Sequence, residues 1–164
     1  MKRRFLLALV ATLPFAGVAS TSLALSPDAT GPQAELPKEK LTIVGRDGVP
    51  HPFNVEMALS QDQQTVGEMF RTSVPMDGGM LFDWGVARES QMWMRNTLVP
   101  LDMVFINADG TIRAIAENTT PRSLAVIDSR GPVRATLELA GGATAGLGIR
   151  VGDTVKQRIF GNGP

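Results

Sequence analysis

The chain contains no cysteine, and this absence excludes several kinds of chemistry at once. Disulfide bonds, thiolate nucleophiles and sulfur-rich zinc sites all require cysteine. An acylated lipoprotein is excluded too, because its lipid would be attached to a cysteine after the apolar N-terminal run. Stability must therefore come from buried apolar surface, and a chain of 164 residues is long enough to bury one self-sufficient core.

Histidine is nearly absent as well. A serine nucleophile would have only His51 as its base, and no Gly-x-Ser-x-Gly turn is present to expose a serine. His51 stands between Pro50 and Pro52 at the start of an expected strand, where an exposed edge position is the ordinary explanation. We therefore do not expect hydrolysis by a serine nucleophile.

The apolar run near the N-terminus is short for a helix that remains in a membrane. Residues 5–19 are apolar and follow three basic residues, but Pro14 interrupts them and they fall short of the roughly 20 residues that a spanning helix needs. A basic head, a short apolar run and small residues up to Ala24 are typical of a secretory signal peptide over residues 1–24. Cleavage fits equally well after Ala19 or Ala24, and a retained N-terminal anchor is the alternative. We expect a periplasmic or secreted protein with no stable membrane span after cleavage.

An excess of basic residues is also missing. The whole chain has 16 Lys and Arg against 16 Asp and Glu, and loss of residues 1–24 would leave 13 against 16. A mildly acidic protein lacks the basic face with which nucleic-acid binders displace counterions from phosphates. Nucleic acid is therefore not expected as a partner.

The organisation of the chain predicts one small domain. Residues 25–40 are rich in proline, alanine and charge without an apolar period, which predicts a flexible lead. The domain follows over residues 41–160, with a short tail at 161–164. Eight or so short apolar runs, one or two brief helices and no long βαβ period predict a mainly β fold, either a small β-sandwich or a partly closed barrel.

Several elements carry local signals. Ser60 and Gln63 have the spacing of a capping box, which predicts a short helix over residues 61–71. An Asp-Gly pair at 109–110 predicts a hairpin turn within residues 102–118. Two separate strands are expected over residues 80–84 and 90–96. Residues 133–139 alternate so that Arg134, Thr136 and Glu138 point outward to solvent.

Four segments, taken in order, resemble a known family. They are VGEMFR (66–71), GGMLFDW (78–84), MWMRNTLVPLDMVFI (92–106) and LELAGG (137–142). Over residues 41–160 the chain resembles domain of unknown function family 192, although Glu68 replaces a residue that is often apolar and Arg95 replaces a lysine. The resemblance implies a small, mostly β domain of jelly-roll-like architecture that is commonly exported, and it implies no activity.

A polar cluster marks the entry to the most apolar predicted strand, residues 102–106. Asp102 begins this strand, and a buried carboxylate must find partners because its desolvation costs several kcal/mol. The nearest candidates are Arg95, Asn96, Thr97 and the backbone N–H groups of residues 96–99. Two interpretations remain open: the cluster locks a tight connection between strands, or Arg71, Arg95, Asn96, Thr97 and Asp102 hold a small polar ligand.

Two further hypotheses are alternatives to ligand binding by the polar cluster. A hydrolase of an envelope glycan could use Asp102 with Asp83 or Glu138 as paired carboxylates. Met92 and Met94, on one face of the expected strand, could bind Cu(I), although core packing explains methionines more simply. Our leading hypothesis is a non-catalytic ligand-binding or interaction module without cofactor or metal, whose partner is a small polar ligand or an envelope protein.

Overall fold

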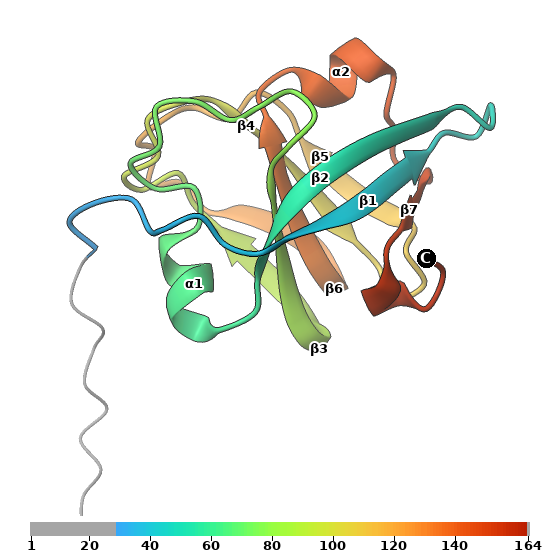
Figure 1. The fold of residues 1–164 in the computed structure, drawn as a ribbon, viewed down its shortest axis with the longest axis horizontal. Coiled ribbons are helices and arrows are strands. Elements are labelled where there is room, and N and C mark those ends of the chain that lie inside the picture. Colours follow the sequence, from blue (N-terminus) through green and yellow to red (C-terminus); the bar gives the residue numbers. More distant parts are fainter. Residues whose placement is uncertain (1–28, 164) are drawn as a thin grey trace, which may run out of the picture.

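A computed structural model of the chain describes residues 29–163. The predicted signal peptide, residues 1–24, lies outside the described residues. Figure 1 shows the order of the elements, with α1 at the lower left of the view and α2 at its top. The elements are β1 (Lys38–Val44), β2 (Pro50–Ala58), α1 (Gln61–Val66), β3 (Met80–Met92), β4 (Leu101–Ile106), β5 (Ile112–Ala116), β6 (Ile127–Ala140), α2 (Ala143–Leu147), β7 (Thr154–Lys156) and the 3₁₀ helix η1 (Arg158–Phe160).

The seven strands form one sheet in the order β5-β4-β6-β3-β2-β1-β7. Neighbouring strands are antiparallel except for β2 and β3, which pair in parallel. The two outer strands meet through a bridge between Thr111 and Thr154, next to which the N–H of Ile112 donates to the carbonyl of Asp153 at 2.9 Å. The sheet is therefore nearly closed into a barrel, which confirms the predicted mainly β fold with short helices.

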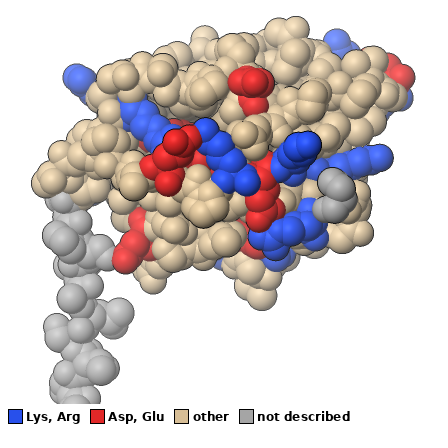
Figure 2. Space-filling model, in the orientation of Figure 1, with Lys and Arg blue, Asp and Glu red and all other residues tan. Residues whose placement is uncertain are grey.

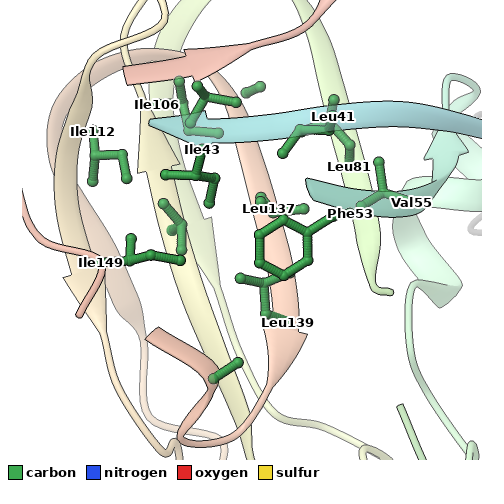
Figure 3. Packing of buried hydrophobic residues seen from close by; sticks show 14 of the residues in the cluster. Leu41, Ile43, Phe53, Val55, Leu81, Ile106, Ile112, Leu137, Leu139 and Ile149 are labelled. Carbon is green, nitrogen blue, oxygen red and sulfur yellow. The ribbon is translucent and has the colours of Figure 1, made fainter. Parts of the chain in front are cut away.

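Apolar side chains from alternate strand positions fill the interior of this barrel (Figure 3). Ile43 from β1, Val55 from β2 and Leu137 from β6 all have no exposed surface. Burial of each such side chain stabilises the fold by roughly 1.5–3 kcal/mol. The interior cluster therefore explains how the domain folds without disulfides.

The outer face of the sheet is covered too. Loop residue Met94 packs there against Leu101, Met103 and Phe105, and a smaller cluster contains Phe82. Residues 135–140 of β6 are buried on both faces of the sheet, because the outer face is covered along this part of the strand. The expectation that Thr136 and Glu138 point to solvent is therefore wrong, because their exposed fractions are 0% and 4%.

Local signals were the most accurate guides to the elements. The capping box of α1 is present, with Ser60 accepting from the N–H of Gln63, and β4 and β5 form the predicted hairpin. The expected strands at 80–84 and 90–96 are one strand, β3, with irregular register against β6 between them. This strand ends at Met92, because a turn follows in which the N–H of Thr97 donates to the carbonyl of Met94 at 3.0 Å. Strand β1 starts at Lys38, inside the segment predicted as a flexible lead.

Candidate functional site

A pocket of about 300 Å³ lies between α1, β3, β6 and the loop after β3. Two acidic side chains line it, Glu68 from the segment after α1 and Glu138 from β6, and we call them the acid pair. The side chains around them are mainly aromatic, apolar or neutral polar, among them Phe82, Trp84, Trp93, Gln64 and Gln91. The pocket is thus an amphipathic site around two carboxyl groups.

Gly67 allows the acid pair to form. It ends α1 with φ 51° and ψ −134°, a combination that side-chain-bearing residues avoid. A Cβ atom at this position would lie 2.9 Å from Cζ of Phe82 and 3.6 Å from Oε2 of Glu138. The chain therefore passes close to the outer face of β6 and places Glu68 beside Glu138.

Glu138 is a buried carboxyl group without a counterion of its own. Its Oε2 atom has no hydrogen-bond partner among the described residues. Burial, and secondarily the charge of Glu68, raises the pKa of Glu138 to about 8, although the Glu68 backbone N–H and the charge of Arg71 act in the opposite direction. The group is therefore mainly protonated at neutral pH and able to donate as well as accept a hydrogen bond.

Glu68 belongs to a second network that centres on Arg71. The guanidinium forms a fork with Glu56, with Nη1–Oε1 and Nη2–Oε2 distances of 2.6 and 2.8 Å. Its Nε atom is 3.1 Å from Oε2 of Glu68, a close charge contact without hydrogen-bond alignment. Burial raises the pKa of Glu68 to about 7, opposed by Arg71 and assisted by Glu56.

The same network holds Glu56 in its ionised form. Burial alone would raise the pKa of Glu56, but hydrogen bonds from Arg71 and from the backbone N–H of Leu36 outweigh burial and lower it. The N-terminal segment adds another contact, because the Gln33 side chain donates to the carbonyls of Gln63 and Gly67 at 3.1 and 3.0 Å. Residues before β1 thus brace the end of α1 and the acid pair.

Asp102 is buried, but its partners differ from those predicted. Its carboxylate accepts from the N–H groups of Asn118, Gly142 and Thr144 and from the hydroxyl of Thr144, at 2.6–2.9 Å. Burial opposes ionisation, yet these hydrogen bonds keep the pKa of Asp102 below its ordinary value. Asp102 therefore ties β4 to the loops after β5 and β6 rather than to the loop before β4. The prediction that Asp102 locks the loop of residues 95–99 is therefore wrong, because its hydrogen bonds go to Asn118, Gly142 and Thr144.

The other predicted ligand-binding residues are divided between neighbouring surfaces. Asn96 has φ 56°, and its carbonyl accepts from the N–H of Phe70 at 2.8 Å. Thr97 lines the pocket of the acid pair, and Arg71 lies within 3.1 Å of Glu68. Arg95 stacks over Trp93 at 5.5 Å from the ring centroid and lines a different cavity. The structure thus brings Arg71 and Thr97 to the acid pair and leaves Asp102 elsewhere.

The two minor hypotheses find no support in this geometry. Asp83 forms an ion pair with Arg134, and Asp102 has no exposed surface, so neither carboxylate is free to act with Glu138. Met94 is fully buried, and its sulfur accepts from the Thr119 hydroxyl at 3.1 Å. Among residues 29–163, no group of three or more His, Cys, Asp or Glu is placed to hold a metal ion.

Sequence reasoning missed Glu56 and Glu68 and gave Glu138 a solvated position. A usable signal existed, because Glu68, Trp84, Trp93 and Glu138 each fall in one of the four segments that carry the family resemblance, and the structure brings all four residues to one pocket. Glu68 is also a point of departure from the family pattern, so this chain has one more acid there than the resemblance implies.

The fold and the pocket define a class of protein, a nearly closed seven-stranded β-barrel domain with a buried acid pair beside its outer face. The sequence model of domain of unknown function family 192 (DUF192), described as "Uncharacterized ACR", matches residues 42–157. The chain belongs to this family, as the sequence indicated. No curated protein matches it significantly.

The chain is similar to several solved structures. A crystal structure from Sinorhizobium meliloti 1021, described as a candidate transcription regulator, has 43% identity and a TM-score of 0.75 and covers 77% of this chain and 98% of its own. A protein of unknown function from Novosphingobium aromaticivorans DSM 12444 has 36% identity and a TM-score of 0.73, and the match covers 79% of this chain and 91% of that protein's chain.

No helix in residues 29–163 is long and apolar enough to cross a membrane.

Proposed function

We propose that this domain is a non-catalytic module that binds a small polar ligand in the pocket of the acid pair. One observation carries the proposal: Glu138 is buried beside Glu68, and its Oε2 has no partner among the described residues. Both Oε2 atoms are covered, so a ligand would engage the carboxyl groups after they turn toward the pocket. Rotation about the last side-chain bond of glutamate is soft enough to allow this.

Stability does not explain the acid pair. Burial of a carboxyl group without a full set of partners costs several kcal/mol, and apolar residues of similar size would remove this cost. Buried groups with strongly shifted pKa values that line a pocket are typical of functional sites. The walls supply aromatic and amide groups, which would contact the apolar and polar parts of a ligand.

A binding screen tests the proposal directly. Small sugars, amino acids, amines and carboxylic acids would be added singly to ¹⁵N-labelled protein, and amide shifts would be recorded. We expect at least one class to shift Glu68, Trp84 and Glu138, and to raise the free energy of unfolding by about 2.7 kcal/mol at a hundred times its Kd. The Glu138→Leu variant should remain folded and lose both effects.

The matched control is Arg95→Ala, which changes the neighbouring cavity instead. If shifts map to Arg95, Asn96 and Leu98 and survive Glu138→Leu, the ligand binds in the cavity beside Arg95 and the acid pair is not part of its site. If no compound shifts the pocket, the proposed function is wrong.

The name of the Sinorhizobium relative refers to transcription for that protein. The described residues offer little for such a role here, because their α-helices span only six and five residues. Helix-based DNA readers need a longer recognition helix in the major groove. On the face shown in Figure 2, acidic side chains lie among the basic ones.

We also propose that the domain is exported, as the sequence of residues 1–24 predicts. Cell fractionation with N-terminal sequencing of the mature protein tests this, with Ser20 or Leu25 expected as the first residue. Intact protein that stays in the cytosol would contradict it.

A further inference from the structure

The charges around the acid pair are unbalanced. Three carboxyl groups, Glu56, Glu68 and Glu138, surround one guanidinium, and Arg71 already forms its two-pronged contact with Glu56. In a buried site, a carboxyl group without a counterion must hold a proton. A cation with N–H donors could take the place of that proton and satisfy the free Oε2 atom of Glu138.

The aromatic residues of the pocket already bind cations. The Arg88 guanidinium lies 4.2 Å from the centroid of the Trp84 ring, and that of Arg95 lies 5.5 Å from Trp93. Both tryptophans line the pocket. Aromatic faces attract ammonium and guanidinium groups, most strongly where water is excluded. The walls and the acid pair therefore favour the same sign of charge.

The shape of the site favours an organic cation over a metal ion. A metal would need several oxygen or nitrogen ligands at short range, and residues 29–163 present no group of three or more His, Cys, Asp or Glu placed to hold one. The pocket volume of about 300 Å³ leaves room for a carbon chain beside the charged group.

We propose that the ligand is a small primary amine, whose ammonium group donates hydrogen bonds to the carboxylates of Glu138 and Glu68 while its carbon chain lies against Trp84. This inference rests on the proposed function and names its ligand class. Binding expels the proton that the acid pair holds, so amine and proton compete for the site.

The competition between amine and proton determines whether amine affinity rises or falls with pH. The charged or titratable groups that face Glu138 are Glu68 and Arg71, with Glu56 behind them and Arg88 on β3 also lining the pocket. The raised pKa of Glu138, about 8, means that an amine must displace its proton at lower pH. Amine affinity should therefore rise as pH rises toward 8, by up to about tenfold per pH unit.

Three probes of similar size separate the possibilities in ¹⁵N shift titrations from about pH 6 to about pH 8. Butylammonium chloride should bind, shift the amides of Glu68, Trp84 and Glu138, and tighten with pH. 1-Butanol has the same chain without the charge and should bind at least tenfold more weakly. Tetramethylammonium chloride has the charge without N–H donors and should also bind more weakly. Calorimetry in buffers of different ionisation enthalpy should show proton release on binding of the amine.

Two variants with the same Glu→Gln replacement complete the experiment. Glu138→Gln should weaken butylammonium binding at least tenfold and abolish its pH dependence, whereas Glu117→Gln, at an exposed position, should change neither. If 1-butanol, or a sugar from the binding screen, binds this pocket as well as the amine does, the amine inference is wrong and the binding function stands. If butylammonium binds without proton release or pH dependence, or does not bind, the inference is wrong. Only failure of the whole screen would remove the binding function as well.

Discussion

Replacement of Glu138 by glutamine should make the protein more stable at alkaline pH and leave it nearly unchanged in mild acid. Glutamine has the size of a protonated glutamic acid and can make similar hydrogen bonds, but it cannot ionise. Because the pKa of Glu138 rises from its ordinary value of 4.5 to about 8 on folding, the native state binds more protons than the unfolded state between these values. Stability of the wild type therefore falls as pH rises through this window and levels off above it.

The magnitude follows from the width of the window. Each pKa unit corresponds to about 1.36 kcal/mol, and the shift of Glu138 spans 4.5 to about 8. Between about pH 5 and about pH 8.5, the wild type should lose about 3–4 kcal/mol relative to Glu138→Gln. Glu68 titrates in both proteins, so its contribution largely cancels from the difference.

Urea unfolding followed by far-ultraviolet circular dichroism, at pH steps across this range, measures the difference. Glu39→Gln is a matched control, because the hydrogen bond from Arg158 lowers the pKa of Glu39 and its stabilising effect is already complete above the ordinary value of 4.5. Its curve should run parallel to that of the wild type above about pH 5. Parallel curves for Glu138→Gln as well would refute the reasoning, since they would mean that Glu138 titrates normally in the native state.

Two other substitutions test the networks beside the pocket. Asp102→Ala leaves the N–H groups of Asn118, Gly142 and Thr144 without their acceptor and should lower the free energy of unfolding by at least about 3 kcal/mol in urea melts. The pKa of Asp102 is lowered in the native state, so the loss of unfolding free energy in Asp102→Asn should be full above the ordinary pKa of 3.8. The loss should become smaller as the pH falls below that value, and a loss that is independent of pH would contradict this account. Arg71→Met should cost about 3–5 kcal/mol because it leaves Glu56 buried without its partner. Adding Glu56→Leu should recover most of that loss, and simple additivity of the two changes would show that the pair is not coupled.

The fold was predictable where its signals are local. Ser60 and Gln63 form their capping box within one turn of chain, and the hairpin of β4 and β5 depends on four turn residues. The end of β3 was not predictable from alternation, because Met94 continues the apolar pattern although it lies in a loop. Its side chain is buried against Leu101, Met103 and Phe105, and its N–H donates to the carbonyl of Ser123, about 30 residues further along the chain; no local pattern reveals such contacts.

The acid pair shows why the site was harder to predict than the fold. Alternation along β6 correctly put Leu137 and Leu139 inside the barrel, and it put Glu138 on the other face. Whether that face is wet depends on what covers it, and the cover comes from segments near residues 68 and 94 that are distant in sequence. Periodicity therefore gives the direction of a side chain but not its solvation.

Gly67 connects the backbone fold to the chemistry of the site. An alanine there would bring its Cβ to 2.9 Å from Phe82, so the segment after α1 would have to move away from β6 and take Glu68 with it. Separation of the acid pair would lower the pKa of Glu138, because both its burial and its repulsion from Glu68 would weaken. The backbone conformation at Gly67 thus contributes to the raised pKa of Glu138, because it lets Glu68 lie beside Glu138. A ligand that binds the acid pair would depend on position 67 without touching it.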